Sequence, residues 1–159
     1  MNTKQHQGSF NILLADDDID DRDLFEKALK EIPIDTHLRT VSNGEELMDY
    51  LFENSMNLPD VLFLDLSMPR KTGFECLVEI KEDKKLEDLP VVIFTTSFTQ
   101  GLELEMILSN TLCSMGAHVY KRKPSGFREL KQTIYDALIS IEKIRLTAGD
   151  GLLGGVVNR

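Results

Sequence analysis

Residues 10–23 of the chain read FNILLADDDIDDRD, a short apolar run followed at once by six aspartates within eight residues. The run Phe10–Ala15 is nearly continuous rather than alternating, which is typical of a parallel strand buried on both faces. Asp18 suits a helix N-cap, and Asp20 and Asp21 suit the first turn, where the positive end of the helix dipole favours acids. The stretch therefore predicts a buried strand, an acidic turn and a helix in succession.

The same alternation of strand and helix continues to about residue 146. Two more apolar runs, a weaker one and an alternating edge-type segment predict four further strands: Val61–Leu64, Val91–Phe94, Ala117–Tyr120 and His37–Val41. Apolar residues recur at helical spacing within 24–32, 47–51, 74–80, 102–107 and 127–141. This βαβαβαβαβα order predicts an α/β fold, a three-layer, doubly wound, five-stranded parallel sheet.

The chain's 159 residues divide into a polar N-terminal extension (1–9), one domain (10–146) and a Gly-rich C-terminal tail (147–159). The tail contains a GxGxxG match at Gly149–Gly154, but no strand precedes it, so we interpret the match as chance.

The net charge of −9 argues against nucleic acid or an anionic membrane as a partner. The N-terminus lacks the apolar core of a signal peptide, and no apolar run reaches the roughly 20 residues needed to cross a bilayer. Cys76 and Cys113 form neither a disulfide framework nor a metal motif, which fits a reducing cytoplasm.

Polar side chains follow four of the predicted strands: Asp16 and Asp17 after the first, Asp65 after the third, Thr95 after the fourth and Lys123 after the fifth. Each has an ordinary explanation alone, as a loop entry, a cap or a solvated charge. Together they would meet at the carboxyl edge of the sheet, where open α/β folds bind ligands. Three carboxylates there favour Mg²⁺, and a lysine and a hydroxyl can hold the oxygens of a phosphoryl group attached to a carboxylate.

With its acid pair, the D-x-x-M-P-x-x-x-G stretch at Asp65–Gly73, Thr95 and Lys123-Pro124, the chain resembles the receiver domain of two-component response regulators. The resemblance covers about Asn11 to Ile144 and is closest to single-domain, chemotaxis-regulator-like receivers. It implies a flavodoxin-like sheet with the strand order 2-1-3-4-5.

The resemblance also implies a role for each residue at this edge. Asp65 would be the phosphoacceptor, and Mg²⁺ (with Mn²⁺ as a substitute) would be bound by Asp65, Asp17 and the backbone carbonyl of Ser67, with Asp16 acting through water. Thr95, Thr96 and Lys123 would contact the phosphoryl group, and Tyr120 would be an aromatic switch. The Lys123–Pro124 bond would be a cis peptide.

The implied function is that of a phosphoacceptor in a His-Asp phosphorelay, supplied by a histidine kinase or a histidine phosphotransfer protein. Phosphorylation would switch a surface for a downstream protein target, and the domain would dephosphorylate itself without being a dedicated enzyme. The spacing from Thr95 to Lys123 is longer than usual, so residues 99–116 should hold a longer helix or a larger loop.

Two other functions stay open. A haloacid-dehalogenase-like phosphohydrolase would need a second acid where this chain has Ser67, and a pseudo-receiver module would never take phosphate. A further question concerns the last helix, where apolar residues recur at steps of 4, 3, 4 and 3 from Leu130 to Ile144. This stripe packs on the sheet or, with the tail 152–157, forms a homodimer surface.

Overall fold

The apolar runs pair into one parallel sheet with the strand order β2-β1-β3-β4-β5, as predicted. The computed structural model describes residues 9–96 and 101–157, and for 148–157 it describes the backbone alone. Apart from Ser9, the predicted N-terminal extension lies outside the described residues. The strands are β1 (Phe10–Ala15), β2 (Thr36–Val41), β3 (Val61–Leu64), β4 (Val91–Thr95) and β5 (Val119–Arg122).

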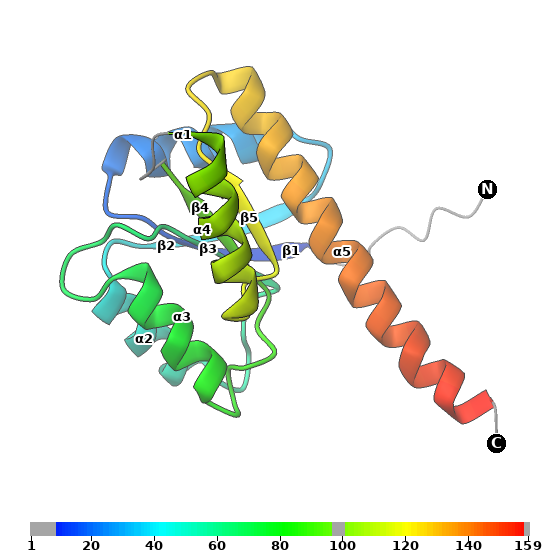
Figure 1. Ribbon diagram of the computed structural model, residues 1–159. Coiled ribbons are helices and arrows are strands. Elements are labelled where there is room, and N and C mark those ends of the chain that lie inside the picture. The colour runs from blue at the N-terminus through cyan, green and yellow to red at the C-terminus, as the bar shows by residue number, and fades with distance from the viewer. Residues whose placement is uncertain (1–8, 97–100, 158–159) are drawn as a thin grey trace.

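Five helices cover the two faces of the sheet and make the three layers (Figure 1). They are α1 (Ile19–Lys30), α2 (Gly44–Glu53), α3 (Gly73–Glu82), α4 (Leu102–Ser114) and α5 (Phe127–Val157). Buried residues of α1 and α5 pack on one face, and buried residues of α2, α3 and α4 pack on the other.

The central strands are apolar throughout because successive side chains enter opposite cores. In β3, Leu62 and Leu64 join the core under α2 and α3, whereas Val61 and Phe63 join the core under α1 and α5. On that second side Phe63 packs edge to face with Phe25 and Phe94, at ring centroid distances of 5.0 and 5.9 Å. These contacts pack α1 against β3 and β4 beneath the edge from which Asp65 and Thr95 project.

The loop from β3 to α3 is held by a helix cap and by a backbone hydrogen bond across the loop. At its end, Thr72 caps α3 through a capping box with Glu75. Gly73 donates its N–H to the carbonyl oxygen of Leu66, and a Cβ at Gly73 would lie 2.2 Å from the carbonyl oxygen of Asp65. A glycine is therefore needed here for α3 to pack against the backbone of Asp65.

Strands β2 and β4 are each one residue longer than expected from the sequence, and the structure differs more at two other elements. Strand β5 begins at Val119 rather than at Ala117, because its bounds follow pairing with β4, from Val92–Val119 to Thr95–Arg122, rather than apolar content. Helix α5 continues through the glycine-rich segment to Val157, so no element boundary falls at residue 147. Figure 1 shows the second half of this helix projecting past the sheet.

Helix α4 fills most of the longer 99–116 segment. Gly101 and Gly116 bracket it with positive φ angles of 106° and 108°, a conformation that glycine adopts readily. No helix among the described residues is both long and apolar enough to span a membrane.

Candidate functional site

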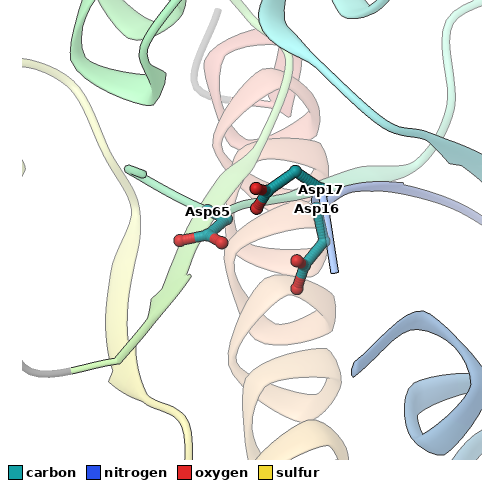
Figure 2. A group of neighbouring side chains, drawn as sticks. All are labelled: Asp16, Asp17 and Asp65. Carbon is teal, nitrogen blue, oxygen red and sulfur yellow. The ribbon is translucent and has the colours of Figure 1, made fainter. Parts of the chain in front are cut away.

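The structure gathers three aspartates at the carboxyl edge of the sheet. Asp16 and Asp17 directly follow β1, and Asp65 directly follows β3 (Figure 2). Their carboxylates each offer an oxygen within 4.8 Å of the others. Asp16 and Asp65 are buried and Asp17 is exposed, so the group opens to solvent on the Asp17 side.

Lys123 reaches into this acidic group from the segment after β5. Its Nζ lies 2.6 Å from Asp16 Oδ2, 3.0 Å from Asp21 Oδ2 and 3.3 Å from Asp65 Oδ2. The backbone N–H of Lys123 donates to the carbonyl oxygen of Thr95 at 2.8 Å, which joins the residue to the end of β4. Burial alone would lower the pKa of the lysine, but the carboxylates of Asp16 and Asp65 outweigh burial and raise it. The ammonium therefore stays charged at any physiological pH.

Asp16 is the most deeply buried carboxylate of the group. Burial raises its pKa, and the hydrogen bonds from Lys123 and from the Asp18 N–H only partly offset this. Arg22 donates a guanidinium hydrogen bond to the Asp16 carbonyl oxygen at 2.8 Å, so α1 fixes the backbone as well. A further cation beside Asp16 would favour its ionised form.

Asp65 accepts hydrogen bonds on both carboxylate oxygens. Thr95 Oγ1 donates to Oδ1 at 2.8 Å, the Ser67 N–H donates to Oδ1 at 3.3 Å, and Lys123 occupies Oδ2. Thr95 is fully buried, whereas Ser67 and Thr96 are exposed beside it. The side chain predicted to accept a phosphoryl group is thus flanked by a hydroxyl and an ammonium.

Tyr120 lies on β5, partly buried against the core under α4. Burial raises the pKa of its phenol, and the nearby Glu105 carboxylate of α4 raises it further. Glu105 also forms an ion pair with Arg122 of β5 at 3.5 Å. Within the described part of the chain the buried hydroxyl of Tyr120 has no hydrogen-bond partner. Tyr120 therefore lies with Glu105 and Arg122 where β5 meets α4.

The predicted cis bond is wrong for this structure. None of the described residues has a cis peptide bond, so Lys123–Pro124 is trans. Trans is the ordinary preference of an X–Pro bond, by roughly 0.5–1 kcal/mol. Lys123 reaches Asp16, Asp21 and Asp65 with the bond trans.

Asp21 is the site residue that the sequence analysis missed. Its place in the first turn of α1 has a sufficient explanation in the helix dipole, and the N-cap Asp18 does accept from its N–H. The available signal was its position one helical turn after the acid pair, which aims a carboxylate back at the strand end.

The donor set suits a small, hard divalent cation. Mg²⁺ and Mn²⁺ prefer carboxylate and carbonyl oxygens, and Mg²⁺ is commonly bound by one or two carboxylates plus water and phosphate oxygens. Asp16, Asp17 and Asp65 provide such oxygens at mutual distances that one ion could bridge. The geometry therefore fits a cation-assisted transfer of a phosphoryl group.

Comparison with known proteins agrees with this geometry. The family model for the response regulator receiver domain matches residues 12–135. A probable methanogenesis regulatory protein, FilR2 of Methanothrix harundinacea, is 32% identical over 128 residues, which cover 79% of each chain. Response regulator Rcp1 of Synechocystis is 38% identical over 94 residues, 56% of this chain and 63% of that protein.

Solved structures show the same similarity. The phosphorylated cyanobacterial phytochrome response regulator RcpA superposes with a TM-score of 0.65 at 32% identity, covering 79% of this chain and 88% of that one. The Mn²⁺-bound form of Rcp1 superposes with a TM-score of 0.65 at 29% identity, covering 77% and 86%.

Proposed function

Because this chain belongs to the response regulator receiver family, we propose that it accepts a phosphoryl group on Asp65 and signals by the resulting change of surface. The observation that carries the proposal is the environment of Asp65. Its carboxylate lies between the Thr95 hydroxyl and the Lys123 ammonium, within 4.8 Å of two further carboxylates. A buried aspartate arranged in this way is suited to hold a group with anionic oxygens.

In the proposed reaction a carboxylate oxygen of Asp65 attacks the phosphorus of a phosphohistidine. The new O–P bond forms as the N–P bond breaks, and the departing imidazole keeps the bonding electrons and takes up a proton. Lys123 and Thr95 then donate to the phosphoryl oxygens. Asp17, Asp65 and the Ser67 carbonyl, with Asp16 acting through water, would hold Mg²⁺ or Mn²⁺, which supplies neutralising charge when bound.

The signal would pass through Thr95 and Tyr120. The Thr95 hydroxyl now donates to Asp65, and a phosphoryl group adding about −1.5 to −2 charge offers it stronger acceptors. Movement of Thr95 would alter the space available to Tyr120 next to α4. The proposed readout is a new arrangement of α4 and β5, recognised by a downstream protein target.

We also propose that the domain returns to its resting state by itself. Water attacks the phosphorus, the O–P bond breaks, and inorganic phosphate and the Asp65 carboxylate are released. The receiver family is generally a non-enzymatic signalling module, so this step resets a switch and turns over no separate substrate. A histidine kinase or phosphotransfer protein as donor, in the cytoplasm, completes the proposal.

The two alternatives have less support. A haloacid-dehalogenase-like hydrolase needs an acid two residues after its nucleophile, and Ser67 stands there. A pseudo-receiver would not need Asp65, Thr95 and Lys123 in mutual contact, yet they are.

The test is intact-mass spectrometry after incubation with acetyl phosphate, with and without Mg²⁺, on the wild type and on Asp65→Asn. We expect one Mg²⁺-dependent phosphoryl adduct in the wild type and none in Asp65→Asn. A folded wild type that binds Mg²⁺ and forms no adduct would instead support the pseudo-receiver. An adduct that persists in Asp65→Asn would assign the acceptor elsewhere.

We propose a homodimer through the outer part of α5, beyond the residues that pack on the sheet. Leu130, Ile134, Ala137 and Ile141 are buried against the sheet, so most of the 4-3-4-3 stripe is already used within the domain. Ile144 and Leu146 are about half-exposed where α5 leaves the sheet, and the backbone continues as a helix to Val157. Sedimentation equilibrium showing a monomer at high concentration, with and without acetyl phosphate, would exclude this proposal.

A further inference from the structure

The three N–H donors of the Lys123 ammonium group are matched by three neighbouring carboxylates. An ammonium group carries three N–H donors, and three carboxylates lie within 3.3 Å of Nζ: those of Asp16, Asp21 and Asp65. The lysine side chain is 9% exposed, so water has little access to it. A phosphoryl oxygen that binds Lys123 must therefore displace one of these three partners.

The three partners differ in how easily they can leave. The Asp16 side chain is 2% exposed, and separating it from Lys123 would strand a buried charge. Asp65 is the proposed acceptor, so it remains beside the lysine together with the group it carries. The Asp21 side chain is 36% exposed and can return to water at small cost. Asp21 is thus the partner whose departure costs least.

We propose that Asp21 is a positioning residue that occupies the Lys123 donor later taken by a phosphoryl oxygen. This inference rests on the proposed function and extends it to a residue outside the acid pair. In the resting state Asp21 holds the ammonium in place from the first turn of α1. When the phosphoryl group arrives, Asp21 competes with it for the donor and repels its negative charge, and so limits how readily Asp65 is occupied.

The chain offers a matched control at the neighbouring residue. Asp20 is also in the first turn of α1 and is exposed, and no contact joins its carboxylate to Lys123 in the described structure. Asp20→Asn and Asp21→Asn remove the same charge from the same helix end. A difference between them reports the contact with Lys123 rather than net charge or the helix dipole.

The experiment measures the affinity of the full chain for beryllofluoride, a non-covalent phosphoryl mimic, by calorimetry at saturating Mg²⁺. We expect Asp21→Asn to bind the mimic about three- to tenfold more tightly than the wild type, because one competing charge-assisted hydrogen bond is gone. Asp20→Asn should change the affinity by less than about twofold, and Asp21→Glu, which retains a carboxylate, should stay near the wild type. With acetyl phosphate, the rate at saturating donor should rise by a similar factor in Asp21→Asn.

Equal affinities in Asp21→Asn and Asp20→Asn, or weaker binding in Asp21→Asn, would overturn the inference and leave the proposed function standing. A wild type that neither binds beryllofluoride nor takes up phosphate would overturn both. Circular dichroism verifies that each variant is folded, and Asp21→Ala supplies a second substitution should Asp21→Asn fold poorly.

Discussion

Two partly buried lysines lie at opposite ends of the parallel strands, one at the carboxyl ends and one at the amino ends. They have different hydrogen-bond partners. Lys123, at the carboxyl edge, is surrounded by carboxylates, which raise its pKa. Lys81 of α3, at the amino edge, donates to the backbone carbonyls of Glu87 and Leu89, each at 2.9 Å, and burial lowers its pKa. Neutral carbonyls satisfy an ammonium group without stabilising its charge as a carboxylate does.

The contacts around Lys81 join parts of the fold to one another. A Cβ at Gly116 would lie 2.8 Å from the Lys81 side chain, so the α4–β5 turn packs directly on it. Nearby, His118 Nδ1 accepts a hydrogen bond from the Val91 N–H at the start of β4. Burial and the charge of Lys81 lower the pKa of this histidine, which keeps it neutral and able to accept. The contacts at the amino ends of the strands therefore hold loops in place, whereas the carboxyl ends carry a group of carboxylates around one buried ammonium.

The largest effect on stability should come from removing the positive charge of Lys123 at the carboxyl edge. Lys123→Met leaves Asp16 buried without its cation, and we expect unfolding free energy at pH 7.5 without Mg²⁺ to fall by about 3 kcal/mol. Without Lys123 the pKa of Asp16 rises further, so the penalty applies above that pKa and disappears as the pH falls through it. Urea unfolding followed by circular dichroism at pH 7.5 and 5, with and without Mg²⁺, measures this.

For the same variant, added Mg²⁺ should recover part of the loss, because it replaces the missing positive charge. Phosphorylation by acetyl phosphate should fall more than about 100-fold. An unfolding free energy that is unchanged, or that falls equally under all four conditions, would show that Lys123 does not compensate the acidic group.

A smaller effect is expected at the amino edge. Lys81→Met removes two hydrogen bonds to backbone carbonyls and should lower the unfolding free energy by about 1–2 kcal/mol. Since no carboxylate is stranded, the loss should be the same with and without Mg²⁺, and phosphorylation should be retained. A loss of unfolding free energy that depends on Mg²⁺ would contradict the difference described between Lys81 and Lys123.

The smallest effect should be the pH dependence contributed by His118. Its pKa is lowered in the folded state, so the stability it contributes is complete above its ordinary pKa of 6.5 and is lost as the pH falls below that value. His118→Gln keeps an acceptor for Val91 and cannot titrate. The wild type should therefore lose slightly more stability than His118→Gln between pH 7.5 and 5.5, measured by thermal unfolding. Parallel curves would assign the titration to other groups.

The contrast between the edges also explains what could be predicted from the sequence. Asp16, Asp65 and Lys123 each follow a strand and Thr95 ends one, and parallel topology brings such positions together whatever the intervening sequence. Lys81 could not be predicted in the same way, because its partners are backbone carbonyls, which have no sequence signature. Asp21 was missed for a different reason: a helix N-terminus was already a sufficient explanation for an acid there.

The bounds of strand β5, at one side of the sheet, were also hard to predict from the sequence. Strand β5 is half-exposed, so its apolar content is low, and its bounds depend on pairing with β4. The glycines in the last segment lower helix propensity without preventing α5 from continuing to Val157.

The placement of Lys123 directly after the last strand has a consequence for synthesis on the ribosome. Its acidic partners precede it by 107, 102 and 58 residues. At roughly 5–20 residues per second, all three carboxylates are present on the nascent chain for about 3–12 s before their shared cation is translated. Until then β1 and β3 can pair while the site they carry is an uncompensated acidic cluster. The acidic site is therefore completed only after β5 has been translated, and translation that stops before β5 yields a chain lacking both an edge strand and the site's neutralising charge.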